Sequence, residues 1–306
     1  MNSAQTLSSN RRPLVVGEVL FDEFEDGAEV LGGAPFNVAW HLQGFGIRPL
    51  LISRVGDDTQ GRQVLDAMRH WGMDVRGIQL DPAHPTGRVQ VRLRGVQPDF
   101  TILPEQAYDF IDTDAARRSL RGVAVALLYH GSLITRHTAR VALQNLRENL
   151  AVPVFLDINL RAPWWQRAGV EALMRGVQWL KLNDAELAAL LQRELLTQSE
   201  TVRGASQLRA QCGCAWLIVT QGAVGAQLFG EREHYNATAA PVRKPVDSVG
   251  AGDAFSAVLI LGICRDWPLP VSLRRAGEFA AAVCAQRGAI AQDRALYRGY
   301  QEQWQC

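Results

Sequence analysis

The chain has 306 residues, of which 47% are hydrophobic and 21% charged, and its formal net charge is +1. This length can bury a large core, and the composition is that of an ordinary globular protein. The balanced charge, without a Lys/Arg-rich block, excludes the electrostatic pattern of proteins that bind nucleic acids or anionic membranes. The longest strongly apolar stretch, Ala254 to Cys264, is too short to span a bilayer. We therefore expect neither a nucleic-acid nor a membrane partner.

Residues 1–13 are polar and lack the apolar centre of a secretory signal. We expect them to form a flexible tail, in a protein that resides in the cytoplasm. Five cysteines are an odd number for a chain of this size, so we interpret them as reduced thiols rather than as a disulfide framework.

From residue 14 onward, short apolar runs alternate with amphipathic stretches. Most of the apolar runs are nearly continuous, as expected of strands that helices cover on both faces. The predicted strands are Leu14–Leu20, Pro49–Ser53, Val123–Leu128, Val152–Leu156, Val177–Leu182, Trp216–Thr220 and Ala226–Phe229. The predicted helices span residues 34–44, 58–71, 112–121, 136–149, 166–175, 184–194, 203–211, 254–264 and 271–287. This alternation predicts one α/β domain over residues 14–306, with a doubly wound, mainly parallel sheet.

Two segments depart from this alternation. Phe21–Leu31 is acidic and rich in turn residues, whereas Gly87–Ile111 alternates strictly between polar and apolar residues from Val89 to Leu93 and again from Asp99 to Ile102. Such alternation is typical of antiparallel strands with one face in water. We predict that both segments belong to one small β flap, which projects from the sheet and acts as a lid over the site.

The first candidate site motif, Gly32-Gly33-Ala34-Pro35-Phe36-Asn37, opens the predicted helix 34–44. Proline is favoured in the first turn of a helix, and paired glycines let a ligand approach the backbone closely. Asn37 offers both a donor and an acceptor to a polyol. On these residues alone, a plain helix start explains the segment equally well.

Polar residues directly follow the predicted strand Val152–Leu156. Alternation places Asp157, Asn159 and Arg161 on one side of the chain, at a strand end, where ligands of open α/β sheets bind. The arginine fork is a natural partner of phosphate oxygens. The alternative is a solvated loop with a local ion pair.

Asn183 and Glu186 stand three residues apart at the start of the predicted helix 184–194. This spacing by itself favours a helix cap, with the asparagine at N-cap and the glutamate at N3. The same pair could also orient water bound to Mg²⁺ near nucleotide phosphates, because Mg²⁺ keeps several waters and takes few carboxylates.

The segment from Thr220 to Gly225 closes the predicted strand Trp216–Thr220 with two glycines, Gly222 and Gly225. Small residues there could admit a nucleotide, and a hairpin turn explains them just as well. The sequence contains no P-loop, no dinucleotide-binding Gly-x-Gly-x-x-Gly after the first strand, no His-Glu-x-x-His and no Gly-x-Ser-x-Gly. P-loop kinase, dehydrogenase, metalloprotease and hydrolase functions are therefore disfavoured.

The most informative motif is Asp247-Ser248-Val249-Gly250-Ala251-Gly252-Asp253, which precedes the apolar run to Cys264. Its small residues let the backbone come close to an anion, and the amides that open the next helix point at that anion with the positive end of the helix dipole. A carboxylate beside such a cradle, here Asp253, suits removal of a proton from a hydroxyl that attacks a phosphoryl group. As an alternative, Asp253 merely caps the helix.

Together, these segments resemble the ribokinase-like (PfkB) carbohydrate kinases. Gly32 to Ala39 is similar to the N-terminal signature of that family, and Asp247 to Phe255 is similar to its C-terminal signature. Between them, the family's order is kept by Asp157-x-Asn159-x-Arg161, Lys181-x-Asn183-x-x-Glu186 and Thr220-x-Gly222-x-x-Gly225. The resemblance extends over residues 14–292 and implies ATP-dependent phosphorylation of a sugar hydroxyl.

The resemblance also implies catalytic and sugar-binding roles. Asp253 would take the proton from the attacking hydroxyl, and the amides of Gly250, Ala251 and Gly252 would form the anion hole for the transferring phosphoryl group. The sugar would be held by Asp22, Gly33 and Asn37, with Arg161 as a phosphate contact. His130 could also reach the sugar, although a histidine at a strand end is more often structural.

For the cofactors, the resemblance implies ATP, Mg²⁺ and a monovalent cation. Asn183 and Glu186 would organise Mg²⁺ and its water, in addition to any capping role. Thr220, Gly222 and Gly225 would line the nucleotide site, joined by residues 284–288. Many relatives bind K⁺ beside the anion hole, and Asp247 with carbonyls near Val249 and Gly288 stands in the corresponding place.

Fewer residues of the sequence indicate which sugar is the substrate. Ala34-Pro35 after the glycine pair resembles fructokinases, whereas ribokinases usually carry a lysine there, and Tyr129-His130-Gly131-Ser132 lacks the glutamate that ribokinases have near this point. We predict fructose or a similar hexose as the substrate. The alternatives are a nucleoside or keto-deoxy sugar acid kinase, and a non-catalytic sugar- or nucleotide-binding regulator, against which the retention of Asp253 argues. The flap could also join two chains in a homodimer.

Overall fold

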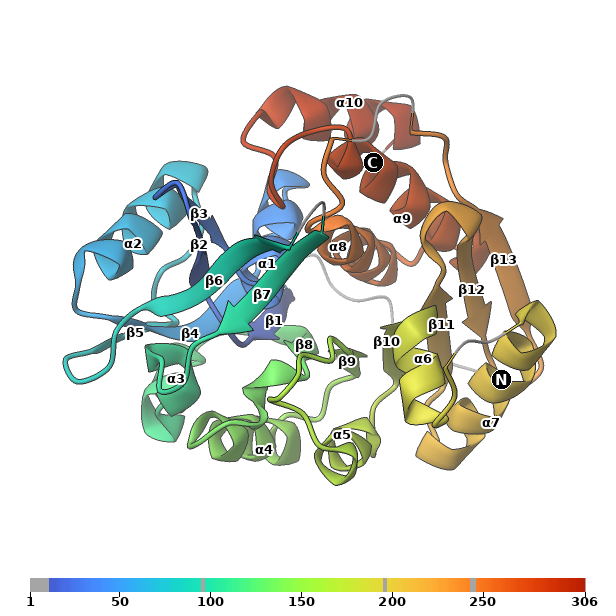
Figure 1. Cartoon of the computed structure of the whole chain (residues 1–306), viewed down its shortest axis with the longest axis horizontal. Coiled ribbons are helices and arrows are strands. Elements are labelled where there is room, and N and C mark those ends of the chain that lie inside the picture. The colour runs from blue at the N-terminus through green and yellow to red at the C-terminus, as the bar shows by residue number, and fades with distance from the viewer. Residues whose placement is uncertain (1–10, 95–96, 195–196, 243–245, 306) are drawn as a thin grey trace.

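The computed structural model describes residues 11–94, 97–194, 197–242 and 246–305. Its centre is a nine-stranded sheet in the order β13-β12-β11-β10-β9-β8-β1-β4-β5 (Figure 1). Its strands are β1 (Arg12–Val16), β4 (Leu50–Gly56), β5 (Ile78–Asp81), β8 (Val125–Gly131), β9 (Val154–Asp157), β10 (Trp179–Asn183), β11 (Trp216–Thr220), β12 (Gly225–Phe229) and β13 (His234–Thr238). Along this sheet order, all neighbouring strands between β11 and β5 pair in parallel, and β12 and β13 add an antiparallel edge. The predicted mainly parallel sheet is confirmed.

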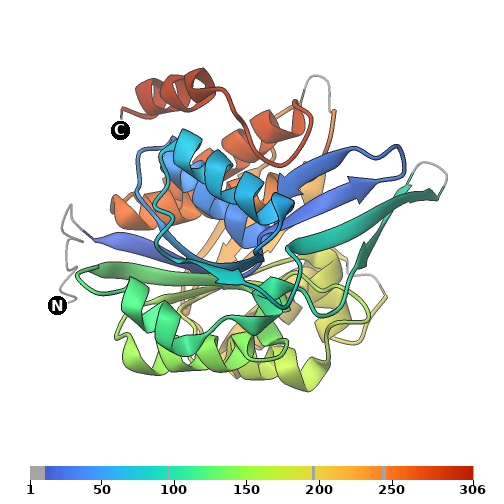
Figure 2. The same cartoon turned by 90° about the vertical axis from the view of Figure 1, so that its left-hand side faces the viewer.

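Helices cover both faces of this sheet (Figure 2). One face carries α1 (Ala34–Gly44), α2 (Thr59–Trp71), α8 (Ala251–Cys264), α9 (Leu269–Cys284) and α10 (Arg294–Trp304). The other carries α3 (Thr113–Ser119), α4 (Ala139–Asn149), α5 (Arg167–Met174), α6 (Asp184–Leu190) and α7 (Gln198–Cys212). Successive residues of β1 point to opposite faces, so Val15 packs in one core while Leu14 and Val16 pack in the other. Continuous apolar strands are the sequence signature of this double covering.

Helix α8, which reaches the site, is deeply embedded. Every residue from Ala254 to Gly262 is buried, as expected of a helix that is apolar on all sides. Trp40 of α1 supports the same face of the sheet: it stacks on Trp71 with ring centroids 4.6 Å apart, and its Nε1 donates to the carbonyl of Ala291 at 2.9 Å. This packing joins α1 to α2 and to the loop that precedes α10.

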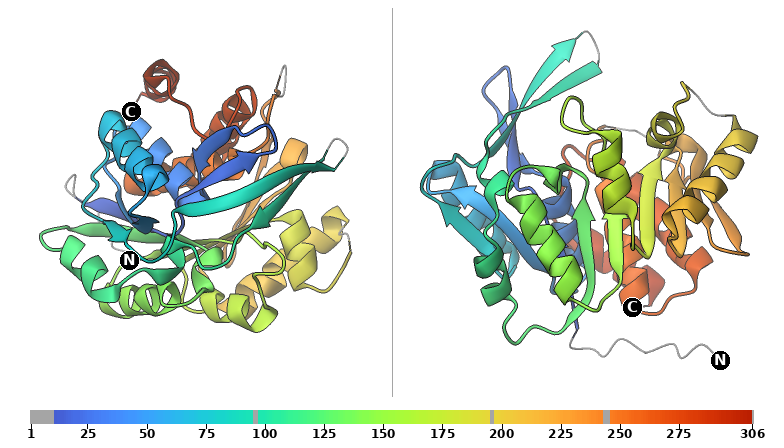
Figure 3. Two further views of the ribbon diagram at one scale, coloured as in Figure 1. Left: turned by 60° about the vertical axis from the view of Figure 1, so that its left-hand side comes forward. Right: turned by 90° about the horizontal axis from the view of Figure 1, so that it is seen from below.

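A second sheet of four strands, in the order β3-β2-β6-β7, stands out from one side of the body (Figure 3). It consists of β2 (Leu20–Phe24), β3 (Glu29–Gly32), β6 (Gly87–Arg94) and β7 (Gln97–Ile102). The two hairpins β2–β3 and β6–β7 are antiparallel, and β2 joins β6 in parallel. Its strands come from the two segments 21–31 and 87–111, and the chain leaves the sheet after Ile102 to form the 3₁₀ helix η1 (Ala107–Phe110). We call this sheet the flap.

Several element boundaries differ from the predictions. The predicted strand Leu14–Leu20 ends at Val16, because Gly17 has a φ of 150° and packs against Pro35, and the chain then turns into β2. Helix α6 ends at Leu190 instead of residue 194, with Gln192 at a φ of 56°. Helix α7 is longer than the predicted 203–211, because Thr197 and Glu200 form a capping box at its start. Strands β5 and β13 and helix α10 were not predicted.

The N-terminal prediction needs a correction as well. Arg12 and Pro13 lie in β1 and not in a tail, because Arg12 donates from Nη1 to Asp74 and its backbone pairs with the strand β8. The remainder of the predicted tail, residues 1–10, lies outside the described residues. Within the described ranges, no helix is both long enough and apolar enough to cross a lipid bilayer.

Candidate active site

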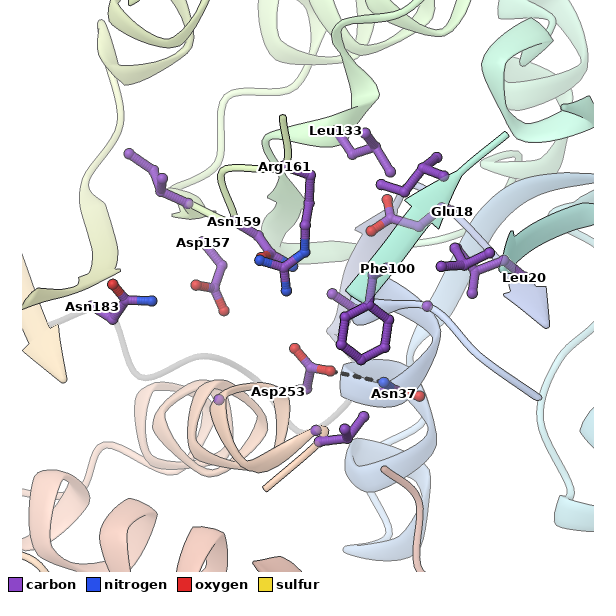
Figure 4. A pocket seen from close by; sticks show the side chains of 18 of the residues that line it. Glu18, Leu20, Asn37, Phe100, Leu133, Asp157, Asn159, Arg161, Asn183 and Asp253 are labelled. Carbon is purple, nitrogen blue, oxygen red and sulfur yellow. Dashed lines mark hydrogen bonds between the residues drawn. The ribbon is translucent and has the colours of Figure 1, made fainter. Parts of the chain in front are cut away.

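A cavity of about 410 Å³ lies where the ends of β8, β9, β10 and β11 meet the flap and the start of α8 (Figure 4). The structure brings most of the predicted site residues together in its wall: Asp22, Gly33, Asn37, Arg161, Asn183, Glu186, Thr220, Gly250, Gly252 and Asp253. The flap contributes Val89, Phe100 and Ile102. Motifs that are far apart in the sequence therefore form one site.

Asp253 sits in the first turn of α8 and faces the start of α1. Asn37 Nδ2 donates a hydrogen bond of 2.8 Å to Asp253 Oδ2 (Figure 4). Burial raises the pKa of Asp253 to about 7, even though the bond from Asn37 acts in the opposite direction. A carboxyl group with a pKa near neutrality is well matched to accepting a proton from a hydroxyl and releasing it afterwards.

The residue at the start of α8 must be glycine for steric reasons. Gly250 adopts a left-handed φ of 78°, and a Cβ there would lie 2.4 Å from the Cβ of Ala289. Ala254 N makes an early helical bond to Gly250 O at 2.9 Å, and Ala251 N bends back to Ser248 O at 3.3 Å. The amides of Gly250, Gly252 and Asp253 make no backbone hydrogen bond to another described residue, as is usual at a helix start, and so can receive an anion.

His41 supports the loop behind Gly250. This fully buried histidine of α1 contacts the carbonyl of Ala289 through Nε2 at 3.0 Å and the hydroxyl of Tyr297 in α10 through Nδ1 at 2.9 Å. Burial lowers the pKa of His41 to about 4, so the ring is neutral at pH 7. The C-terminal helix is thereby connected to the residues that shape the anion hole.

A buried polar network lies beside the anion hole, and we call this part of the cavity the phosphate end. Lys181 Nζ donates to both carboxylate oxygens of Asp157, at 2.7 and 2.9 Å, and both side chains are only 7% exposed. Ser256 Oγ lies 2.6 Å from Asp157 Oδ2 and 3.0 Å from the carbonyl of Gly252, so the network reaches the first turn of α8. The sequence motifs contained Asp157 and Lys181, but their spacing gave no indication that the two side chains pair with each other.

Asn183 and Glu186 form the capping box that their spacing favours. Asn183 Oδ1 accepts from the amide of Glu186, and Glu186 Oε2 accepts from the amide of Asn183, both at 2.8 Å. Glu186 Oε1 also accepts from the amide of Leu160 at 3.1 Å, which anchors the loop after β9. Burial raises the pKa of Glu186. Both residues line the phosphate end of the cavity, so capping does not exclude a second role.

The opposite part of the cavity, which we call the sugar end, lies between Asn37, Asp22 and the flap. Gly33 is required there, because it has a φ of 108° and a Cβ would lie 2.7 Å from the carbonyl of Glu18. Glu18 also lines the cavity and was missed by the sequence analysis, since a single glutamate after a strand carries no spacing signal. Burial raises the pKa of Asp22 to about 6 and that of Glu18 to about 7, and the cation of Arg161 acts against both shifts.

Other predicted site residues lie outside the cavity wall. His130 is fully buried, its Nδ1 contacts the carbonyl of Gly131 at 2.8 Å, and burial lowers its pKa to about 3; the predicted contact with the sugar is not supported. Gly222 lies in the 3₁₀ helix η3 (Gly222–Val224), and Gly225 packs against Ala237 O of β13, so both serve the hairpin turn. Asp247 accepts from the amides of Val249 at 3.0 Å and Gly288 at 3.2 Å.

The described residues contain no cluster of three or more His, Cys, Asp or Glu side chains that could hold a metal ion directly. A divalent cation in this cavity would therefore depend on ligands from bound phosphates and water. That matches the preference of Mg²⁺, which usually takes one or two protein carboxylates. Glu186 in the cavity wall fits such an indirect role.

Comparison with known proteins identifies the class to which this fold and site belong. The family model of the pfkB family carbohydrate kinases matches residues 15–295. This chain therefore belongs to the pfkB family carbohydrate kinases, and it is a sugar kinase.

Individual relatives are similar over nearly their whole length. A fructokinase of Klebsiella pneumoniae is 32% identical over 276 residues, which cover 83% of this chain and 85% of the relative. The crystal structure of fructokinase from Vibrio cholerae O395, with fructose, ADP and calcium bound, is similar with a TM-score of 0.77 and 25% identity, covering 94% of this chain and 98% of that one. A sugar kinase of Pyrococcus horikoshii in complex with ATP has a TM-score of 0.75 at 25% identity, covering 90% and 93%.

Proposed function

We propose that this chain transfers the γ-phosphoryl group of ATP to a hydroxyl of a hexose, and that fructose or a closely similar ketohexose is the substrate. The observation that carries the proposal is Asp253, a carboxyl group with a raised pKa at the start of α8, inside a cavity that also holds free helix amides. Similarity to fructokinases of Klebsiella pneumoniae and Vibrio cholerae supports the choice of fructose.

In the proposed reaction, Asp253 removes the proton from the attacking sugar hydroxyl. The sugar oxygen then forms a bond to the γ-phosphorus while the bond from that phosphorus to the bridging oxygen breaks, and ADP leaves. The free amides of Gly250, Gly252 and Asp253 stabilise the charge on the transferring group, in a position supported by Ala289 and the buried helix α8. Phosphoryl transfer depends mainly on positioning and charge stabilisation, which this arrangement can supply.

The nucleotide and its cations would occupy the phosphate end. Thr220 lines the cavity there and would contact the nucleotide, together with residues around 284–288. Asn183 and Glu186 would hold the water shell of Mg²⁺, and Asp247 with neighbouring carbonyls would hold K⁺. Bound Mg²⁺ neutralises phosphate charge during transfer. Arg161 would provide a further cationic contact to phosphate or sugar.

The flap would close over the sugar and exclude water, because Val89, Phe100 and Ile102 bring apolar side chains to the cavity. The same flap could pair with that of a second chain, and a homodimer in the cytoplasm is the assembly that we propose.

The test is ADP release by the purified protein with Mg²⁺-ATP and K⁺. The panel contains fructose, tagatose, glucose, ribose, 2-keto-3-deoxygluconate, adenosine and inosine. We expect fructose or tagatose to give the highest kcat/KM. Strong ADP release only with a nucleoside or with the keto-deoxy acid would identify that compound, and not a hexose, as the substrate. ATP binding without ADP release on any compound would favour a binding protein that lacks catalysis.

A further inference from the structure

The polar atoms at the sugar end are not all satisfied by the protein. Glu18 Oε2 and Asn37 Oδ1 are buried and make no hydrogen bond to any described residue, although both residues line the cavity. Glu18 is 5% exposed and Asn37 is 4% exposed. Buried acceptors without a donor cost free energy, and among the described buried side-chain atoms that lack a partner, only these two belong to residues in the wall of this cavity, where a ligand could complete them.

Glu18 is the more informative of the two, because nothing in the protein neutralises it by direct contact. Within the described ranges it forms no ion pair, and Figure 4 shows its carboxylate pointing into the cavity on the side of Arg161. Its charged form is disfavoured mainly by burial and further by Asp253 and Asp109, and it is favoured by a hydrogen bond with the backbone amide of Glu18 itself and by Arg161. Its backbone is fixed, since Gly33 packs directly on its carbonyl. Glu18 Oε2 is therefore an unpartnered acceptor that faces the ligand space.

The remaining surroundings define what ligand would satisfy this acceptor. Apolar side chains cover much of the sugar end: Leu20, Val89, Phe100, Ile102 and Leu133. The other polar groups are the carboxylates of Asp22 and Asp253 and the orphan oxygen of Asn37, with Arg161 as the cation. These acceptors require a ligand that donates hydrogen bonds, as hydroxyl groups do. A ligand carboxylate would bring acceptors where donors are needed, beside three carboxyl groups whose charged forms burial already disfavours.

We propose that Glu18 is a sugar-binding residue that accepts a hydrogen bond from a hydroxyl other than the one phosphorylated, and that the site thereby selects neutral polyhydroxy sugars over sugar acids. The inference rests on the proposed kinase function and adds to it a recognition residue and a substrate class. Glu18 acts in binding and takes no part in proton transfer, which is assigned to Asp253.

The first experiment compares Glu18→Gln with the matched control Glu23→Gln. Glu23 lies in β2 of the flap, pairs with Arg88 at 3.3 Å and does not line the cavity. Because Glu18 accepts from a hydroxyl in a buried site, its variant should raise the KM for fructose by roughly tenfold or more. The KM for ATP should change by less than about twofold, and Glu23→Gln should leave both constants near their wild-type values.

The second experiment identifies the hydroxyl. Each monodeoxy analogue of the sugar, except the one lacking the reacting hydroxyl, is assayed with wild type and with Glu18→Gln. With wild type, kcat/KM should be lower for the analogue that lacks the hydroxyl bound by Glu18 than for the complete sugar. With Glu18→Gln, kcat/KM for that analogue should fall only slightly further, so that the effects of the two changes are not additive. Discrimination between the neutral sugar and 2-keto-3-deoxygluconate should also weaken in the variant.

The inference is overturned if Glu18→Gln leaves the KM for fructose unchanged, or if its effect adds fully to that of every deoxy analogue. Should Glu18→Gln fail to fold, wild type alone provides a test, because a keto-deoxy acid used as well as the neutral sugar contradicts the proposed selection. A wild-type protein inactive on every sugar would instead refute the proposed function. An active wild type with an unaffected variant refutes only the role of Glu18.

Discussion

The phosphate end and the sugar end of the cavity differ in how their carboxylates are satisfied. At the phosphate end, Asp157 is bonded to Lys181 and Ser256, and Glu186 is bonded to two backbone amides. At the sugar end, Glu18 Oε2 has no partner among the described residues and Asp253 has a single bond from Asn37. The first set of groups is completed by the protein itself, whereas the second is left for the ligand to complete.

This difference indicates where the protein is built for stability and where it is built for function. A buried ion pair stabilises the fold only while both partners are present, because removal of one leaves an uncompensated charge. An unsatisfied carboxylate in a cavity weakens the empty protein and strengthens the complex. Variants at the two ends should therefore act on different measurements.

The largest effect should come from the group that we propose as the base. Asp253→Asn removes the base while keeping the shape and the bond partner of the side chain, so kcat should fall by about 10²- to 10⁴-fold. Calorimetric titration should find fructose and ATP affinities within about threefold of wild type. Near-normal turnover of this variant would refute the assignment of Asp253 as the base.

At the phosphate end, Lys181→Met breaks the buried pair with Asp157. The free energy of unfolding should fall by about 3–5 kcal/mol, as measured by urea denaturation followed through tryptophan fluorescence. Glu18→Gln, at the sugar end, should leave the free energy of unfolding unchanged or raise it, since it removes a buried carboxyl group whose charged form burial disfavours in the folded protein. Equal decreases in the free energy of unfolding of the two variants would contradict the proposed difference between the two ends.

At the sugar end, Phe100→Ala removes a flap side chain that lines the cavity. Loss of this apolar contact should raise the KM for fructose by about tenfold and increase ATP hydrolysis without sugar, because water gains access. Phe24→Ala is the matched control, since Phe24 lies in the same flap but is 38% exposed and does not line the cavity. Identical kinetics for wild type and Phe100→Ala would remove the lid role of the flap.

Much of the fold could be predicted from the sequence. Residues 34–44 and 216–220 were placed correctly because clear signals delimit them: a glycine pair with proline at one helix start, and a β-branched apolar run before a glycine turn. The sequence offered weaker signals for α10, whose first turn is capped by Asp293 but whose packing depends on distant aromatic partners such as Phe45, directly after α1, and Phe279 in α9. Such long-range contacts leave no periodic trace.

The candidate site was likewise predicted only in part from the sequence. Asp253, Asn37 and Arg161 were found because short motifs surround them. Glu18 and the pairing of Lys181 with Asp157 were missed, because they arise only when neighbouring strands align their ends. His130 was predicted as a sugar contact from its strand-end position, but the strand continues to Gly131 and encloses the ring.

The most direct test of the account is the pH dependence of kcat/KM for fructose in wild type and in Asn37→Ala. Only deprotonated Asp253 can act as the base, so kcat/KM should rise with pH through about 7, the pKa of that group. The bond from Asn37 lowers the pKa of Asp253, so its loss should move this rise to higher pH. A profile that is flat from about pH 5.5 to 8.5, or a rise at the same pH in both proteins, would contradict the claim that Asp253 takes the proton.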